Sequence, residues 1–283
     1  MNGEKLKNKI KKRAKEIGAQ PQELMQMYFF ERLLYRISIS RYKFNFILKG
    51  GLLLSAIIGD ERRTTSDMDT MIKGIDIESD ELLRIIQEII NIETDDNISF
   101  EIEKAKDIRI DDIYGGVNVK LIAKKDGLIV PLFIDITTKD PITPREIEFK
   151  YKSLFDDTYI KIMAFNKESI IAEKFETLIK DTETNTRAKD FYDLYIIIKD
   201  YWNDLDKTNL IKAIQNTCKR RDSLYILDEI EERFDFIKES NILQNEWNKY
   251  KIAHLYAKDI EYADIMKNIN LIIEELEKGV PII

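Results

Sequence analysis

The spacing of apolar residues predicts both helices and strands between the N-terminus and residue 165. Apolar side chains recur at helical spacing in three segments: 4–16, 21–40 and 80–91. They alternate with polar side chains, as in half-buried strands, in three others: 98–108, 117–124 and 128–137. Asp126-Gly127 separates the last two segments and is a typical hairpin turn. This mixture predicts an α+β fold in which helices flank a mixed sheet.

The remainder of the chain has the pattern of a helical protein. Glycine and proline, which interrupt helices, are absent from residue 167 until the last five residues. We expect Pro141 and Pro144 to end the sheet region, apart from a short strand over 159–164 that closes it. A boundary near Asn166 then gives a sheet-containing core with N-terminal helices and a separate helical domain: residues 1–165 and 166–283.

A glycine pair, Gly50-Gly51, separates a short apolar strand, 46–48, from an apolar helical run, 52–58. The first N–H groups of a helix have no partners within the helix and, together with the helix dipole, favour an anion. Glycine has no Cβ, so a phosphate can approach its backbone closely. A Gly-Gly pair after a strand is more often only a tight turn, so the pair indicates a phosphate site only in combination with other residues.

Two aspartates, Asp67 and Asp69, follow one residue apart. In a strand their side chains point to the same face, where oxygen ligands can hold hard cations such as Mg²⁺. The alternatives are a solvated edge strand or a turn. A third aspartate, Asp135, is flanked by apolar residues in 130–136, and a buried carboxylate normally needs a partner or a metal. The three residues together favour a three-carboxylate metal site.

The combination of Gly50-Gly51, Asp67-Met68-Asp69 and Asp135 resembles the signature of the nucleotidyltransferase superfamily that includes DNA polymerase beta. The longer stretches LKGGLLL and RRTTSDMD resemble the AbiEii/AbiGii-type family more closely. Its members are nucleotidyltransferase-like toxins of bacterial toxin–antitoxin and abortive-infection systems, which serve in phage defence. Ala172-Glu173-Lys174 and 187–194 are similar to helical motifs of the same family. Thr70 departs from the pattern, because the family usually has an apolar residue there.

The resemblance implies a nucleotidyltransferase-like sheet, a helical C-terminal domain, and transfer of a nucleotide from an NTP to an acceptor hydroxyl with release of pyrophosphate. It implies that Asp67 and Asp69 bind Mg²⁺, and that Asp135 completes a second metal site and helps to deprotonate the acceptor. The implied acceptor is RNA, in particular the 3′ end of tRNA. A protein or small-molecule acceptor is an alternative. So is a catalytically silent protein that only sequesters a partner, although an intact trio of aspartates argues against it.

The resemblance also implies a set of residues for the triphosphate. Backbone N–H groups of Gly50 and Gly51 are expected to face the terminal phosphates. The side chains expected to neutralise and position the phosphates are Lys174, with Arg63 or with Thr65 and Ser66. The alternative for Lys174 is a lysine whose ammonium group simply extends into water.

Two further aspartates, Asp190 and Asp193, share a helix face with Arg187. The resemblance implies that the acidic pair orders Lys174 or the catalytic centre, and the spacing does not assign separate roles to the two. The alternative is an exposed Arg187–Asp190 ion pair, which contributes little to stability.

Composition restricts the partners. The formal net charge of −7 argues against a generally basic RNA-binding surface, so an RNA site must be local. The basic segments 4–16 and 219–221 are candidates, although a lysine-rich amphipathic helix is usually just solvated. The expected partners are therefore an NTP, an RNA acceptor and, from the family resemblance, a cognate antitoxin encoded nearby.

Cysteine and histidine usage excludes two other classes of site. A single cysteine, Cys218, permits no intramolecular disulfide and fits a reducing, cytoplasmic setting. A single histidine, His254, rules out a zinc site built from several histidines. The sequence shows no secretory signal and no apolar run near the ~20 residues that span a bilayer, so we expect no membrane association.

Overall fold

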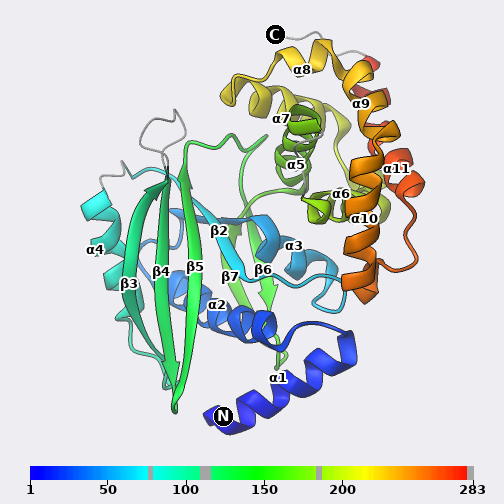
Figure 1. Cartoon of the computed structure of the whole chain (residues 1–283). Coiled ribbons are helices and arrows are strands. Elements are labelled where there is room, and N and C mark those ends of the chain that lie inside the picture. The colour runs from blue at the N-terminus through cyan, green and yellow to red at the C-terminus, as the bar shows by residue number, and fades with distance from the viewer. Residues whose placement is uncertain (76–78, 109–115, 183–186, 279–283) are drawn as a thin grey trace. The chain divides into compact units, whose positions relative to one another are not determined.

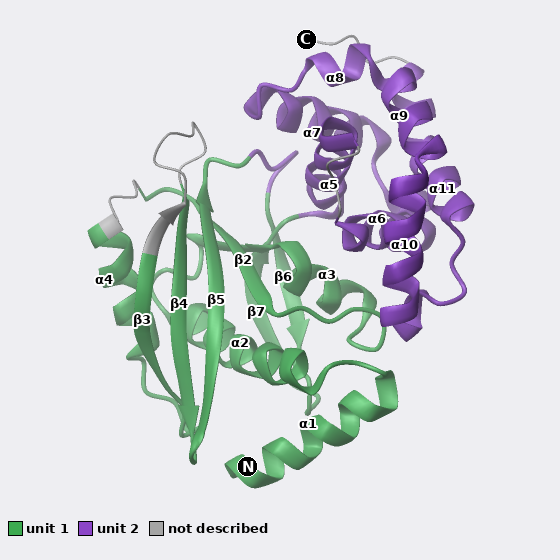
Figure 2. Ribbon diagram, in the orientation of Figure 1, with its two compact units in different colours: residues 1–140, 146–165 green, residues 141–145, 166–283 purple. Residues whose placement is uncertain are grey.

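The computed structural model describes residues 1–75, 79–108, 116–182 and 187–278. These fall into two compact units (Figure 2). The first comprises Met1–Asp140 and Glu146–Phe165, and the second comprises Pro141–Arg145 and Asn166–Ile283. The chain thus passes into the second unit after Phe165, and the short segment 141–145 also belongs to that unit.

A seven-stranded mixed sheet forms the centre of the first unit (Figure 1). Its strands are β1 Phe46–Lys49, β2 Asp67–Ile72, β3 Ser99–Ile108, β4 Gly116–Lys125, β5 Leu128–Thr138, β6 Ile147–Lys152 and β7 Tyr159–Ala164. They are arranged in the order β3-β4-β5-β2-β1-β7-β6. β2 is parallel to β5 and β1 is parallel to β7, whereas the other neighbours are antiparallel. The predicted α+β fold with a mixed sheet is confirmed.

The hairpin between β4 and β5 is confirmed in detail. Asp126 and Gly127 both have positive φ angles, 46° and 82°, which a two-residue turn of this kind requires of its central positions. Residues at equal distances from this turn therefore pair across the two strands, from Lys125 with Leu128 to Gly116 with Thr137. This pairing fixes which side chains of β4 and β5 lie next to each other.

The prediction that Pro141 and Pro144 end the sheet region is wrong, because β6 follows them and pairs antiparallel with β7. β6 lies at the edge of the sheet, and Tyr151 is its one buried residue. An edge strand with a single buried side chain gives little apolar alternation, so the sequence pattern did not reveal it. The closing strand predicted over 159–164 is confirmed as β7.

Helices α2 (Pro21–Ile39) and α4 (Ser79–Ile90) pack on one face of the sheet. Side chains of both helices and of β1, β2 and β5 meet around a small apolar cavity. It is lined by Leu33, Ile37, Phe46, Met68, Thr70, Ile86, Ile89, Ile134 and Ile136. In Figure 1, α4 lies beside β3 at the left of the view and α2 passes behind β5. Because side chains alternate along a strand, the neighbours of Met68 and Ile134 point to the opposite face.

Two further helices belong to the first unit. Helix α1 (Gly3–Ile17) packs on α2 through buried Leu6, Ile10 and Ala14, and its lysines are exposed, as the amphipathic pattern predicts. Arg13 differs from those lysines, because it forms two hydrogen bonds with the carboxylate of Asp60. Helix α3 (Gly50–Ile58) follows β1 directly and packs against β1 and β2.

The described part of the second unit is helical, as predicted. Its elements are α5 Lys167–Asp181, α6 Ala188–Tyr201, η2 Trp202–Asp204, α7 Lys207–Arg220, α8 Tyr225–Asp228, α9 Ile230–Glu239, α10 Asn241–Ala253, η3 Leu255–Ala257 and α11 Tyr262–Glu277. Trp247 is fully buried, and His254 packs its ring on Tyr250 at 4.2 Å between centroids, so both are packing residues. Across the described residues of both units, no helix combines the length and the hydropathy that a membrane crossing requires.

Candidate active site

The three sequence-predicted aspartates lie on one face of the central strands. Asp69 of β2 and Asp135 of β5 occupy the same position in the parallel pairing of these strands, and neighbouring strands are about 4.8 Å apart. Asp67 lies two residues before Asp69 and therefore points to the same face. All three are half-buried, whereas Met68 and Ile134 on the opposite face are buried under α2 and α4. The parallel pairing of β2 with β5 thus places Asp67 and Asp69 beside Asp135, and this pairing of distant segments has no local signal in the sequence.

The row that contains Asp69 and Asp135 continues onto the strands on either side. Asn118 of β4 pairs with Asp135 and donates a hydrogen bond to its Oδ1. Lys49 of β1 pairs with Asp69, and its ammonium group donates to Asp140 at 2.6 Å. The sequence analysis missed Asn118 and Lys49. The hairpin could have revealed Asn118, since it stands as far before the turn as Asp135 stands after it.

Both predicted glycines are required by close contacts. Gly50 has φ +65°, and a Cβ there would lie 1.9 Å from the Oδ2 atom of Asp69. A Cβ on Gly51 would lie 2.8 Å from Oγ1 of Thr65. The N-cap residue Lys49 makes no side-chain hydrogen bond to the first turn of α3. The turn therefore places the start of a helix, with its anion-favouring N–H groups, against the carboxylate of Asp69.

Substitution of Gly50 tests this contact. Gly50→Ala should lower stability by about 1–2 kcal/mol through its positive φ. It should also displace the Asp69 carboxylate and so abolish the nucleotide transfer that the family resemblance implies. Gly74→Ala is the matched control, because Gly74 has φ +76° but the nearest atom to its added Cβ is 3.7 Å away. Thermal melting and nucleotide transfer are measured for both variants. Equal activity of the two would contradict the role assigned to the contact.

The hydroxyl-rich turn before β2 supports Asp67 from one side. Thr65 donates a hydrogen bond to Oδ1 of Asp67 at 2.5 Å, which holds this carboxylate on the site face. Arg63 is buried and donates to the backbone carbonyl of Thr64. Ser66, which was predicted as a phosphate ligand, is exposed. The structure therefore gives Thr65 a positioning contact with a predicted metal ligand.

In the second unit, Lys174 of α5 lies between two carboxylates of α6. Its Nζ atom is 2.8 Å from Asp190 and 2.7 Å from Asp193. Burial alone would lower the pKa of Lys174, but the charges of Asp193 and Asp190 outweigh it and raise this pKa above its ordinary value. Asp190 is buried and binds Lys174, so it is not the exposed carboxylate that the Arg187–Asp190 alternative assumes. Lys174, with a side chain 14% exposed, does not extend into water as the other alternative required.

The residues of the first unit suit a hard cation by their chemistry. Asp67, Asp69 and Asp135 offer oxygen atoms alone, as Mg²⁺ prefers. A carboxylate has about four lone-pair positions, so the single hydrogen bonds recorded at Asp67 and Asp135 leave capacity for a metal. Within the described ranges, no three His, Cys, Asp or Glu side chains converge closely enough to form a ready-made metal cluster. The three aspartates are thus aligned on one face rather than gathered around one point.

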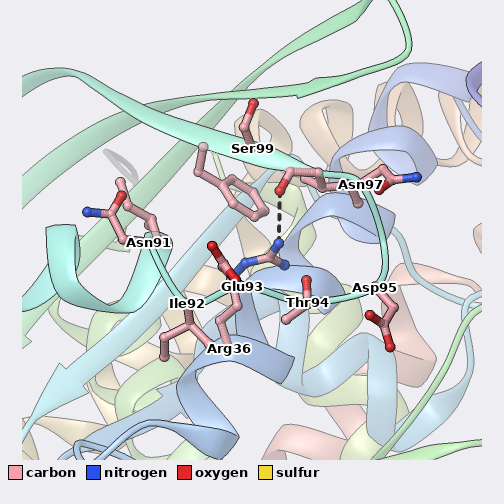
Figure 3. Close-up of a pocket in the computed structure, with 11 residues that line it drawn as sticks. Arg36, Asn91, Ile92, Glu93, Thr94, Asp95, Asn97 and Ser99 are labelled. Carbon is pink, nitrogen blue, oxygen red and sulfur yellow. Dashed lines mark hydrogen bonds between the residues drawn. The ribbon is translucent and has the colours of Figure 1, made fainter.

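A separate cavity in the first unit is lined by Arg36 and by the loop over residues 90–100 (Figure 3). Arg36 is buried and binds both carboxylate oxygens of Asp96, at 2.9 and 3.0 Å, and the carbonyl of Ile98 at 2.9 Å. Burial would raise the pKa of Asp96, but its hydrogen bonds to Arg36 and Thr94 outweigh this and lower it. None of the predicted site residues lines this cavity. Arg36 therefore anchors the loop, and the cavity is distinct from the carboxylate face.

Comparison with known proteins supplies the family. Residues 32–268 match the family model described as the nucleotidyl transferase AbiEii toxin of type IV toxin–antitoxin systems. A Helicobacter pylori protein provisionally assigned as a nucleotidyltransferase has a similar fold, with a TM-score of 0.50 and 18% identity over 92% of this chain and 98% of its own. JHP933 from Helicobacter pylori has the same TM-score and identity, over 92% of this chain and 95% of its own.

Among curated proteins none matches the sequence significantly. The structural similarities, at 18% identity, establish the nucleotidyltransferase-like fold. The family match covers most of the chain and includes both the glycine pair and all six predicted catalytic residues: Asp67, Asp69, Asp135, Lys174, Asp190 and Asp193. The chain therefore belongs to the AbiEii family of nucleotidyl transferase toxins of type IV toxin–antitoxin systems.

Proposed function

We propose that this protein transfers a nucleotide from an NTP to the hydroxyl of an RNA acceptor, with Mg²⁺ held by Asp67, Asp69 and Asp135. The observation that carries the proposal is the pairing of Asp69 with Asp135 on adjacent strands, with Asp67 on the same face. The contact between Gly50 and the Asp69 carboxylate supports it, because it joins a helix N-terminus to the acidic row. A phosphate group is anionic and is repelled by three carboxylates. It can bind beside them only where N–H donors and bound cations offset this repulsion.

The reaction is an in-line displacement at the α-phosphorus of the NTP. The acceptor oxygen forms a bond to this phosphorus while the bond to the bridging oxygen breaks, and pyrophosphate leaves with that electron pair. When bound, Mg²⁺ supplies charge neutralisation for the attacking and leaving oxygens. The proton of the acceptor hydroxyl passes to Asp135, whose Oδ1 atom is held by Asn118.

Binding and orientation of the triphosphate fall to the glycine turn of the first unit. The backbone N–H groups of Gly50 and Gly51 bind the β- and γ-phosphates, and Thr65 keeps Asp67 in place beside them. In the helical unit, Asp190 and Asp193 hold the ammonium group of Lys174, and the role of Lys174 at the triphosphate stays a prediction from the family resemblance. Rate acceleration then comes mainly from positioning and electrostatic stabilisation.

The acceptor proposed is the 3′ end of tRNA. Because the protein has a net charge of −7, the binding site for this RNA must be a local basic surface. Of the two basic segments considered from the sequence, 219–221 is the weaker, because Arg221 binds Glu176 at 2.7 Å. Helix α1 presents exposed lysines and is the stronger of the two. Transfer to a protein hydroxyl or to a small molecule remains the second candidate.

Labelling of a whole-cell extract identifies the acceptor. The protein is incubated with each of the four NTPs, labelled at the α-phosphorus, together with extract and Mg²⁺. We expect the label to migrate with RNA of tRNA size and to become sensitive to ribonuclease. Omission of Mg²⁺ with added chelator is the control for metal dependence. Label found solely in protein or in small molecules would contradict the RNA acceptor and leave nucleotide transfer intact.

An antitoxin is the expected cellular partner, because the family consists of toxins of toxin–antitoxin systems. Expression of the protein alone should arrest growth, and co-expression of the antitoxin encoded nearby should relieve the arrest. Asp69→Asn at equal expression should be harmless if arrest depends on catalysis. Colony counts after induction measure both effects. Equal toxicity of Asp69→Asn would show that the protein acts by sequestering a partner.

A further inference from the structure

The site face of the sheet continues past the aspartates onto an exposed aromatic and basic surface. Phe133 of β5 stands two residues before Asp135, so it points to the same face, and it pairs with Asp67 across β2 and β5. On its other side Phe133 pairs with Lys120 of β4, whose Nζ lies 5.8 Å from the ring centroid. Phe133 is 40% exposed, although it is a large apolar residue beside the proposed metal ligands.

The basic part of this surface extends to β3. Lys120 pairs with Lys104, which is exposed, so two lysines stand directly opposite each other on neighbouring strands. Like charges in this arrangement are destabilising unless an anion lies between or beside them. Glu103 binds Lys120 at 2.5 Å and offsets part of the repulsion, which leaves one net positive charge among these three residues. We call Phe133, Lys120 and Lys104 the β3–β5 platform.

The in-line geometry of the proposed reaction indicates which substrate lies on the platform. The strand order β4-β5-β2-β1 places the glycine turn, which follows β1, on one side of the aspartates and the platform on the other. In an in-line displacement the leaving pyrophosphate and the attacking oxygen lie on opposite sides of the α-phosphorus. With the pyrophosphate at Gly50 and Gly51, the acceptor hydroxyl must therefore approach from the side of β5 and β4.

We propose that the β3–β5 platform binds the single-stranded 3′ end of the RNA acceptor, with a base stacked on Phe133 and backbone phosphates beside Lys120 and Lys104. Aromatic side chains next to lysines form such sites for single-stranded nucleic acid, because every base has a face that can stack. Phe133 is a positioning residue here: it holds the terminal nucleotide so that its hydroxyl reaches Asp135. This inference rests on the proposed nucleotidyl transfer for its orientation, and it adds the surface that receives the acceptor.

Equilibrium binding of a fluorescent single-stranded oligoribonucleotide with a free 3′ hydroxyl tests the platform without requiring turnover. Phe133→Ala should weaken binding about 10-fold, as expected for loss of one stacked base, whereas Phe133→Trp should restore it. Lys120→Gln should reduce the salt dependence of log Kd by about 0.7, the share of one phosphate contact on a single strand. NTP binding should be unchanged in all three variants, since the triphosphate lies at the glycine turn.

Phe44 offers a matched control. It is 63% exposed in the turn before β1 and carries Lys43 over its ring at 4.8 Å, so it reproduces the Lys–Phe pair away from the site face. Phe44→Ala should bind the oligoribonucleotide as the unsubstituted protein does. Thermal melting of both alanine variants shows whether either substitution disturbs the fold, and recovery with Phe133→Trp separates loss of stacking from loss of packing.

Three results would overturn the assignment: no oligoribonucleotide binding by the unsubstituted protein at low salt, equal binding by Phe133→Ala, or an equal loss in Phe44→Ala. These outcomes differ from failure of the proposed function, which is absence of label transfer from any NTP to any acceptor. If the Phe133→Ala variant labels RNA as the unsubstituted protein does, nucleotidyl transfer stands as the function and the assignment of the platform is wrong.

Discussion

Asp69→Asn should abolish nucleotide transfer, by on the order of a thousandfold or more, while the fold stays intact. Asp69 stands opposite Asp135 on the neighbouring strand and touches the backbone of the glycine turn, so it joins the metal ligands to the phosphate-binding helix start. Asparagine fills the same volume but removes the negative charge that a divalent cation requires. Asp67→Asn should have an effect of the same order.

Stability should move in the opposite direction from activity. Asp69→Asn keeps the volume of the side chain and removes the repulsion between carboxylates at paired positions, so it should melt at the same temperature as the unsubstituted protein or above it in metal-free buffer. Added Mg²⁺ should then raise the melting temperature of the unsubstituted protein and leave that of the variant unchanged. Asp157→Asn is the control, because the Asp157 side chain is fully exposed on the same unit. Loss of activity in Asp157→Asn, or full activity in Asp69→Asn, would refute the metal-ligand assignment.

Lys174→Ala should destabilise the helical unit by about 3–5 kcal/mol, because it leaves two buried carboxylates without their cation. The raised pKa of Lys174 means that the ammonium group stabilises the fold fully below the ordinary lysine pKa of 10.5. This contribution is lost only as the pH rises through the raised folded-state value, so the effect of the substitution should be constant around neutral pH. Urea unfolding, followed by the helical circular dichroism signal, measures it.

Lys180→Ala supplies the control for this prediction. Lys180 lies on the same helix and is 3.9 Å from Glu176, but its side chain is 38% exposed, so its loss should cost at most about 0.5 kcal/mol. Lys174→Met combined with Asp190→Asn and Asp193→Asn should recover most of the stability, because no buried charge then lacks a partner. If the recovered protein still fails to bind NTP, the group of Lys174, Asp190 and Asp193 has a role at the triphosphate in addition to its structural one. Equal stability of Lys174→Ala and Lys180→Ala would refute the buried ion triad.

Most elements of the fold could be predicted from the sequence, because their signals are local. The turn at Asp126-Gly127 fixes the pairing of its two strands, and the apolar face of α1 is evident from the spacing of Leu6 and Ile10. β6 could not be predicted, because an edge strand needs few buried side chains. Pro141 and Pro144, which precede β6, lie in a connecting segment that belongs to the second unit. They therefore interrupt the sheet region without ending it.

The site was predictable to a smaller extent. The two-residue period of a strand places Asp67 and Asp69 on one face, but the opposition of Asp69 and Asp135 depends on parallel pairing between segments far apart in the chain. The pairing of Lys49 with Asp69 and the bond of Lys49 to Asp140 depend on the same long-range arrangement. The family resemblance singles out Lys174, whereas its position between both aspartates depends on the packing of α5 on α6.

The fate of the two ends of the triphosphate tests the central claim most directly. Purified protein is incubated with RNA and Mg²⁺ and with one NTP, labelled either at the α-phosphorus or at the γ-phosphorus. Nucleotidyl transfer predicts that the α label enters RNA, that the γ label is released as pyrophosphate, and that neither occurs with Asp69→Asn. Transfer of the γ label to RNA, or equal α labelling by Asp69→Asn, would contradict the account.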